Sequence, residues 1–290
     1  MISTFTKNDS SLNLHQPSIA IIVAVYNGAD TLSACIESLL GQHVPPDQII
    51  IQDGGSTDET LTILEGFRLS VSHVESARDA GIYDAWNKAL RHLDSEWVWF
   101  LGCDDRLADK NVIARLKAYL SSASHEVGLV YGIVHNVSPN GAVSERVGRP
   151  WNQARKAITY RMSVPHTALL ARSHLFSSVG NFDIRYRIAG DFEWFSRAIK
   201  RTHVEFLDQL LVLAGDGGIS QHIKTRLNTV IEYGEIIRRQ GKRRPFRWHW
   251  IYLTTSVNVV LQGVFGHRAR IFIVNAYRVL TFRPPRSSAE

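Results

Sequence analysis

Cysteine is scarce in this chain of 290 residues, and its two copies, Cys35 and Cys103, do not have the spacing of a disulfide framework. We therefore expect a reducing compartment, the cytoplasm. Residues 1–17 lack the charged, apolar and small-residue segments of a secretory signal and are interpreted as a flexible lead. Repeats and low-complexity tracts are missing too. The length suits one large domain with an appendage, or two small domains.

The chain also lacks an uninterrupted apolar run long enough to cross a membrane. The stretch over residues 251–265 is shorter than the roughly 20 residues that a spanning helix needs. Polar residues interrupt it at Thr254, Thr255, Ser256, Asn258 and Gln262. We therefore predict attachment to a membrane surface rather than a transmembrane segment.

Positive charge is concentrated in one short segment, although the net charge of the whole chain is only +6. Basic residues beside interfacial aromatic residues suit an anionic membrane, and residues 238–252 are predicted to contact one. Nucleic acid would satisfy the same charge, but no nucleic-acid partner is predicted. In an alternative interpretation, a C-terminal helix packs its apolar side on the domain and leaves its arginines in water. The segment contains Arg238, Arg239, Lys242, Arg243, Arg244, Arg247, Trp248, Trp250 and Tyr252.

Strands and helices alternate regularly in the first third of the sequence. Residues 19–25 form a β-branched run typical of a central parallel strand. A helix with apolar residues at helical spacing and a second strand complete a right-handed crossover unit, and the alternation then repeats. This pattern predicts an α/β fold with a doubly wound, mostly parallel sheet and helices on both faces. The expected helices cover residues 31–40, 57–67 and 83–93, and the further strands cover residues 48–52, 70–75 and 97–101.

The pattern changes after residue 105. A helix over residues 111–121 precedes a strand over 128–137, and a turn at 139–141 leads into a hairpin strand over 142–147. Short strands and helices then mix as far as about residue 218. A helix over 221–239, with Ser220 as its cap, leads into the basic segment.

Two adjacent carboxylates, Asp104 and Asp105, follow the apolar strand over residues 97–101. Open α/β folds place ligands at this carboxyl edge of the sheet. Neighbouring carboxylates repel each other and lose solvation when enclosed, so they are tolerated best where a cation or a hydroxyl-rich ligand compensates them. In the alternative interpretation the pair lies in a solvated turn and caps the helix that begins near Asp109.

Acids also follow two other predicted strands. Asp53 precedes Gly54 and Gly55, whose small size lets a ligand approach the backbone closely, and Asp79 lies in the segment from Arg78 to Asn87. We call Asp53, Asp79 and the pair Asp104 and Asp105 the three acidic stations. Because parallel strands end at one edge, these stations should converge there. Asp79 could instead cap the following helix. The glycine fingerprint of dinucleotide folds and a Walker lysine loop are both absent, which disfavours NAD and ATP.

Four motifs in this order over roughly 90 residues resemble the amino-terminal half of the family 2 glycosyltransferases of GT-A fold. They are Val23–Asn27, Asp53–Thr60, Asp79–Asn87 and Phe100–Asp105. Three later segments, Pro165–Ala168, Gly180–Asp183 and Gly190–Glu193, resemble the acceptor half of bacterial members that build surface polysaccharides.

This resemblance covers residues 19 to 220 and implies a GT-A domain over 18–220. Its nucleotide-sugar half would span 18–107 and its acceptor half 108–220, with a helical, membrane-proximal extension over 221–290. The implied reaction is an inverting, metal-dependent transfer of a sugar from a nucleotide-diphosphate donor, with UDP-sugars favoured, to a hydroxyl of a lipid-linked glycan. The implied place is the cytoplasmic face of the cell membrane, with the protein bound peripherally.

The resemblance also implies roles for particular residues. Asp53 would contact the base, Asp104 would lie near the ribose, and Asp105 would hold Mg²⁺ or Mn²⁺ on the diphosphate. Asp191 matches the family's catalytic base, because a single displacement needs one carboxylate and no enzyme nucleophile. Glu193 is the second choice as base, and Glu193 and His166 are candidates for acceptor binding. The donor pocket would be completed by Tyr26, Asn27, Arg78, Asp79 and Asn87.

Some of these residues also have a structural interpretation, and the sequence departs from the family pattern at two positions. Asp191 could simply cap the helix over 191–200, and His166 could be a satisfied structural histidine. The acidic motif has no third carboxylate, because position 106 is an arginine. Trp86 stands where the family pattern has a smaller side chain, and its bulk could narrow the donor pocket. A sugar nucleotidyltransferase would need a basic glycine-rich loop after the first strand, which residues 26–30 lack. A non-catalytic membrane or nucleic-acid binding module is the third possibility.

Overall fold

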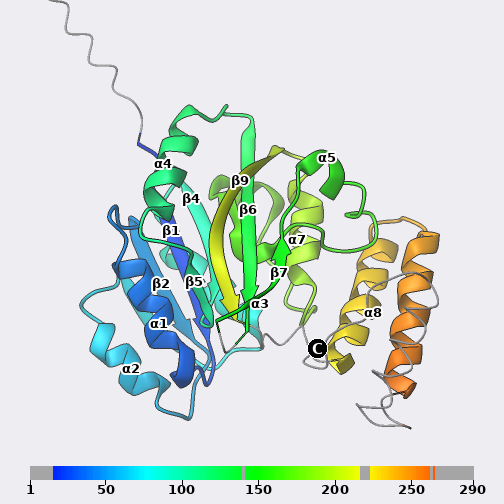
Figure 1. The fold of residues 1–290 in the computed structure, drawn as a ribbon, viewed down its shortest axis with the longest axis horizontal. Helices are drawn as coiled ribbons and strands as arrows, with labels where there is room; N and C mark the ends of the chain where they lie inside the picture. The colour runs from blue at the N-terminus through cyan, green and yellow to red at the C-terminus, as the bar shows by residue number, and fades with distance from the viewer. Residues whose placement is uncertain (1–15, 139–140, 216–222, 262–263, 265–290) are drawn as a thin grey trace, which may run out of the picture.

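A nine-stranded sheet forms the centre of the molecule in the computed structural model, which describes residues 16–138, 141–215, 223–261 and 264 (Figure 1). The strand order is β3-β2-β1-β4-β8-β6-β9-β5, and β7 pairs with β6. The predicted α/β fold with a doubly wound sheet is therefore confirmed. The strands are β1 (Ile19–Val25), β2 (Gln48–Asp53), β3 (His73–Ser76), β4 (Trp97–Gly102), β5 (Asp105–Leu107), β6 (Val127–Val137), β7 (Val143–Val147), β8 (Leu169–Arg172) and β9 (His203–Gly215).

The four strands of the amino-terminal half are parallel to one another, as the alternation of strands and helices predicted. The second half is mixed. β8 runs antiparallel to both β4 and β6, whereas β6 and β9 are parallel. β5 was not predicted; it begins at Asp105, the second residue of the acidic pair, and pairs antiparallel with β9.

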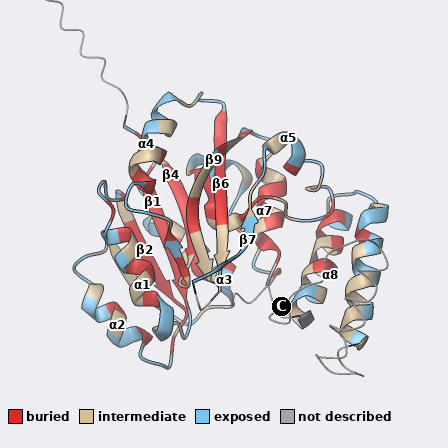
Figure 2. Cartoon of the chain, in the orientation of Figure 1, coloured by how far each residue is buried: buried red, intermediate tan, exposed pale blue. Residues whose placement is uncertain are grey.

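Helices cover both faces of the sheet (Figure 1). Alternate residues of the central strands point to opposite faces, so Ile21 and Val23 pack under one set of helices while Ile22 packs under the other. One face carries α1 (Ala29–Leu40), α2 (Thr60–Phe67) and α4 (Val112–Ser122). The other carries α3 (Ile82–Ala89), α6 (His174–Val179) and α7 (Gly190–Ala198). Figure 2 shows the buried residues concentrated in the sheet between these two layers.

Short elements differ most from the predicted bounds. Pairing of β3 with β2 begins at His73, so the strand starts three residues later than predicted. The predicted helix over 83–93 divides into α3 and the 3-10 turn η1 (Leu90–His92). A further short helix, α5 (Trp151–Ala154), and the 3-10 turn η2 (His166–Ala168) complete the second half.

The carboxyl-terminal region packs beside α7 through α8 (Ile223–Arg239), as Figure 1 shows. A second helix over residues 246–261 packs on α8 through Trp248, whose indole N–H donates to the Val230 carbonyl at 2.8 Å. Trp248 is buried, so its interpretation as an interfacial residue is wrong. Its ring fills the space above Gly234, where a Cβ atom would lie 2.4 Å from the indole.

Within the described residues, no helix combines the length and apolar character needed to span a membrane. Most of the predicted lead over residues 1–17, the boundary at residue 220 with its cap Ser220, and residues 265–290 of the predicted extension lie outside the described residues.

Candidate active site

The tips of β3, β2, β1 and β4 end at the same edge of the sheet. Asp53 is paired with Val25 on one side and with Ser76 on the other, and Ala24 is paired with Gly102. The loops that leave these four tips therefore carry all three predicted acidic stations. Neighbouring strands lie about 4.8 Å apart. Since only β1 separates β2 from β4, the stations after these two strands are about 10 Å apart at the level of the backbone.

Asp53 is fully buried and holds its own loop together. Its carboxylate accepts the N–H groups of Gly55 at 3.0 Å and Ser56 at 3.1 Å, and the hydroxyls of Ser56 and of Ser76, the latter at 2.6 Å. The contact with a nucleotide base stays a prediction. It would require one of these internal hydrogen bonds to be exchanged for one to the ligand.

Asn27 connects the first loop to the second. Its N–H donates to Ser56 Oγ at 2.8 Å, and its side-chain oxygen accepts the Thr57 N–H at 2.8 Å. The backbone at Asn27 has φ 50°, in the left-handed region that asparagine tolerates better than most residues. Tyr26 beside it is 62% exposed, so its ring faces solvent at the edge where the strand tips meet.

The loop after β3 packs directly against the loop after β2. A Cβ atom at Gly54 would lie 2.5 Å from Asp79 Oδ2, so only glycine allows this carboxylate to approach. Asp79 also accepts the N–H of Gly81, the residue directly before α3, at 2.9 Å. Arg78 is exposed, and its Cα lies against Gly55.

Asp104 and Asp105 lie at the end of β4, where the chain passes into β5. Asp105 is buried and accepts the Gly102 N–H at 2.8 Å. Burial and the neighbouring Asp104 raise the pKa of Asp105 to about 7, and burial also raises the pKa of Asp104. No basic side chain among the described residues forms an ion pair with either of these two carboxylates. The alternative interpretation, in which this pair caps the following helix, is wrong, because that helix is α4 and its N-cap is Asn111.

A hollow of about 470 Å³ opens beside Asp104. Its walls come from the first turns of α1, from β5 and from the ends of β6 and β9. Its charged lining residues are Asp30, Asp104 and Arg106. An open space of this size next to Asp104 has room for a ligand.

Asp191 stands at the start of α7, beside α3. Its carboxylate lies 3.4 Å from the Tyr83 hydroxyl of α3 and accepts its neighbour Phe192 N–H at 2.7 Å. Burial raises the pKa of Asp191 to about 6. A carboxylate with a raised pKa is a stronger base than one in water, which suits proton abstraction.

The loop before Asp191 is clamped from two sides. The Tyr83 hydroxyl donates to the Ile188 carbonyl at 2.6 Å. From α8, the Glu232 carboxylate accepts three consecutive N–H groups, those of Arg187 and Ile188 at 3.0 Å each and Ala189 at 2.7 Å. Sequence analysis assigned no role to Tyr83 or Glu232. No local pattern could have found these roles, because Tyr83 is 108 residues from Asp191.

Two of the predicted residues, Asn87 and Glu193, have structural partners, and a third, His166, is buried without a hydrogen-bond partner. Both ends of the Asn87 amide bond to the backbone of Phe182, at 2.9 and 3.0 Å. Glu193 pairs with Arg197 one turn later, at 2.8 Å. The ring nitrogens of His166 are buried without a hydrogen-bond partner, and burial lowers its pKa to about 4. The proposed site therefore does not include these three residues.

Trp86 does not narrow the donor pocket. Its ring is buried on the α3 face, 4.9 Å from Phe100, 5.2 Å from Phe182 and 4.8 Å from His166, measured between ring centroids. The expectation that it would limit the donor is therefore wrong, because the side chain belongs to the core.

Known proteins are similar to this chain in sequence and in fold. The family model "Glycosyl transferase family 2" matches residues 20–176. A PGL/p-HBAD biosynthesis glycosyltransferase of Mycobacterium bovis (strain BCG / Pasteur 1173P2) is 32% identical over 182 residues, which cover 61% of this chain and 68% of that protein.

Two solved structures have the same fold at low identity. The mannosyltransferase PcManGT from Pyrobaculum calidifontis, in complex with GDP-Man and Mn²⁺, aligns with TM-score 0.61 and 15% identity over 91% of this chain and 81% of that chain. S. aureus TarS 1–349 with UDP-GlcNAc aligns with TM-score 0.58 and 16% identity over 87% and 82%. In the UDP complex of TarS 1–349, this chain spans 65% of that chain, slightly under two thirds. With a family model that matches more than half of its residues, the chain belongs to glycosyl transferase family 2 and is a glycosyltransferase.

Proposed function

We propose that the protein transfers a sugar, with inversion, from a nucleotide-diphosphate donor to a hydroxyl of a glycan acceptor, with the help of a divalent cation. The observation that carries the proposal is the shared edge of the parallel strands, where Asp79 follows β3 and Asp104 and Asp105 follow β4, and where no described basic side chain forms an ion pair with the acidic pair. The proposed catalytic domain spans residues 18–220, and the proposed helical extension spans 221–290.

The acidic pair fits a cation. Mg²⁺ and Mn²⁺ prefer oxygen ligands, and they bind through one or two carboxylates together with substrate phosphates. Asp105 would hold the ion, with Asp104 beside it toward the ribose. When bound, the ion would offset the negative charge that develops on the departing diphosphate.

The donor pocket would be formed by the loops after β1, β2 and β3. We propose that Tyr26 and Asp79 contact the donor, that Arg78 supplies positive charge, and that Asp53 and Asn27 act chiefly by fixing the loop over residues 53–57. A UDP-sugar is the proposed donor. TarS has been solved with UDP-GlcNAc and PcManGT with GDP-Man, which supports a nucleotide sugar of one of these two kinds.

Asp191 is the proposed base. Its carboxylate would take the proton of the acceptor hydroxyl while that oxygen bonds to the anomeric carbon and the bond from this carbon to the diphosphate breaks. One displacement of this kind inverts the anomeric centre and requires no covalent intermediate on the enzyme.

We further propose that the extension binds the inner face of the cell membrane peripherally, where a lipid-linked acceptor would be presented. The helix over 246–261 exposes an apolar stripe at intervals of three or four residues, namely Phe246, Trp250, Leu253, Val257 and Val260. Next to the stripe, four basic residues are exposed without a described acidic partner: Arg238, Lys242, Arg243 and Arg247. This combination suits an anionic lipid surface.

Calorimetric titration of the full chain with UDP and GDP, with and without Mn²⁺ or Mg²⁺, tests the donor and the ion together. We expect metal-dependent binding to wild type that weakens by about 10-fold or more in Asp105→Asn, because the ion loses its anionic ligand. Asparagine can still accept the Gly102 N–H, so this variant should fold. Asp208→Asn is the matched control, because Asp208 is an exposed acid in the middle of β9 that pairs with Arg146 and lies outside the proposed site. Absence of metal-dependent binding of any nucleoside diphosphate to wild type would refute the proposal.

A further inference from the structure

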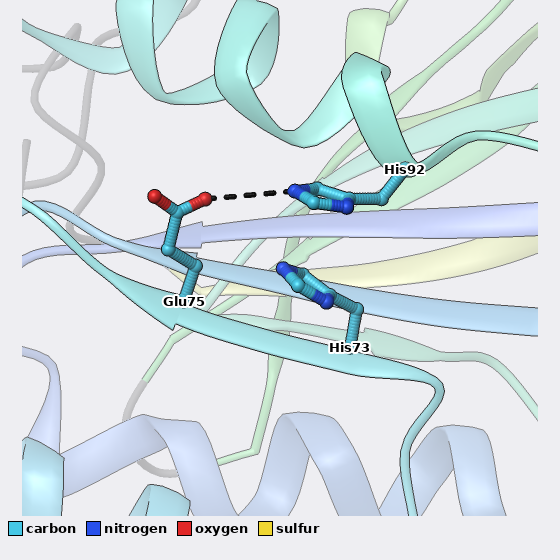
Figure 3. Close-up of side chains that lie close together, drawn as sticks. All are labelled: His73, Glu75 and His92. Atoms are coloured by element: carbon cyan, nitrogen blue, oxygen red, sulfur yellow. Dashed lines mark ion pairs between the residues drawn. The ribbon is translucent and has the colours of Figure 1, made fainter.

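A second group of metal-ligating side chains lies away from the acidic pair. His73 and Glu75 are on β3, and His92 ends η1. His73 and Glu75 are two residues apart on a strand, so their side chains project from the same face. One ligand atom from each of the three residues lies within 4.8 Å of the others. Figure 3 shows the two imidazoles stacked and turned toward the Glu75 carboxylate.

We propose that His73, Glu75 and His92 form a binding site for a transition-metal ion of the Zn²⁺ class. Two imidazoles and one carboxylate are a ligand set that zinc accepts, with water in the fourth position. Imidazole favours zinc and its neighbours over Mg²⁺, which prefers oxygen ligands. The site is therefore chemically distinct from the acidic pair after β4.

One distance between ligand atoms is already close to that around a bound ion. Bonds of about 2.0–2.2 Å in a tetrahedral site place neighbouring ligand atoms about 3.3–3.6 Å apart. His92 Nε2 and Glu75 Oε2 are 3.6 Å apart. The imidazole rings are stacked, with centroids 3.6 Å apart and 21° between the ring planes, so at least one ring must rotate substantially on binding for both lone pairs to meet one ion.

Two further observations point to a ligand. His73 Nε2 is buried and has no hydrogen-bond partner. In contrast, the side chains of His92 and Glu75 are 36% and 40% exposed, which leaves a path for an ion from solvent. The Gln48 amide donates to the His92 carbonyl at 3.2 Å and so holds η1 against the sheet before any ion binds.

The position assigns the ion a structural role. β3 is an edge strand, and an ion bound here would tie it to the turn that follows α3. The site is three strand spacings, about 14 Å, from the strand that carries the acidic pair. Binding should therefore raise the melting temperature without requiring the nucleotide-sugar donor.

Titration of the full chain with ZnCl₂ in excess Mg²⁺ tests the site, and Co²⁺ provides a visible absorption signal of imidazole ligation. Asp105→Asn serves as the background, so that the acidic pair contributes no signal. We expect one Zn²⁺ per chain and a loss of affinity of about 10- to 100-fold or more in His92→Ala, since even outer-shell partners of a metal contribute that much.

The matched control is His203→Ala, because His203 has one glutamate neighbour, Glu126 at 3.3 Å, and belongs to no three-ligand group among the described residues. It should bind Zn²⁺ like its parent. Glu75→Gln should weaken binding as well, since it keeps the shape of the side chain and removes the charge. Unchanged affinity in both His92→Ala and His73→Ala, or no Zn²⁺ binding to the parent, would overturn the assignment.

Discussion

At the scale of single residues, Asp105 and Asp191 are both held in surroundings that oppose their negative charge. Burial raises the pKa of each, to about 7 for Asp105 and about 6 for Asp191. They differ in their neighbours. Asp105 lies beside a second carboxylate, which favours an added cation, whereas Asp191 lies beside the Tyr83 hydroxyl, which favours a single ionised base. The proposed division of work between metal ligand and base follows from this difference.

Asp191→Asn separates the proposed base from donor binding. An amide cannot take the acceptor proton, so we expect kcat to fall by about 100-fold or more while the dissociation constant for the nucleoside diphosphate stays unchanged. The measurement is turnover with the best donor, together with calorimetric titration. Glu193→Gln is the contrast, because Glu193 pairs with Arg197, and its turnover should stay within a few-fold of wild type. Near-normal kcat in Asp191→Asn would remove this residue from the role.

The pH dependence of turnover should show the same group. A base must be deprotonated to act, so kcat should rise about tenfold per pH unit below the pKa of Asp191 and level off above about 6. The residual activity of Asp191→Asn should lack this acidic limb. A profile that is flat between pH 5 and 7 in wild type would contradict the assignment.

Part of this site could be predicted from single residues and part could not. The acidic stations were predictable because each follows a segment that was predicted to form a strand, and parallel strands end together. The partners of Asp53 and Asn87 were not, because Ser76 and Phe182 lie 23 and 95 residues away. Trp86 was misjudged because a helix sequence does not reveal which neighbour fills the space beside it. His73 and Glu75 had a detectable signal, two ligands spaced for one face of a strand, but His92 did not.

At the scale of elements, α3 and α8 together determine where Asp191 lies. α3 holds the Ile188 carbonyl through Tyr83, and α8 holds three N–H groups of the same loop through Glu232. The C-terminal extension is therefore part of the support of the site. The alternative interpretation, a helix packed on the domain with its arginines in water, describes α8 well, whereas the following helix exposes its apolar stripe.

Tyr83→Phe tests this support. Losing the hydroxyl removes the hydrogen bond to Ile188 and costs about 1 kcal/mol of stability. The Tyr83 hydroxyl also lowers the pKa of Asp191, so its loss should move the acidic limb of the kcat profile above pH 6. Tyr131→Phe is matched, because Tyr131 is buried and donates to the Arg149 carbonyl at 2.7 Å. That control should lose similar stability and leave the limb in place. If the kcat profiles of the two variants against pH are the same, the Tyr83 hydroxyl does not tune Asp191 and contributes only to stability.

At the scale of the whole molecule, the exposed apolar stripe and the basic residues lie on the extension, beside α7 and away from the parallel half of the sheet (Figure 1). If the protein binds lipid through this stripe, α7, which carries Asp191 in its first turn, comes close to the lipid surface. Deleting the extension would not test this arrangement cleanly, because Glu232 would be lost with it. Point variants on the exposed stripe avoid that problem.

Leu253→Glu with Val257→Glu should abolish sedimentation with vesicles that contain anionic phosphatidylserine, because both side chains are about half exposed and a charge there cannot enter the lipid. Arg243→Glu with Arg247→Glu should weaken the same binding, and salt should weaken that of wild type, because the attraction to headgroups is screened. Leu69→Glu changes a fully exposed leucine outside the extension and should bind like wild type. If both double variants sediment like wild type, the stripe does not bind lipid. A molecular mass in solution that rises with protein concentration would then indicate that the stripe binds a second copy of the chain.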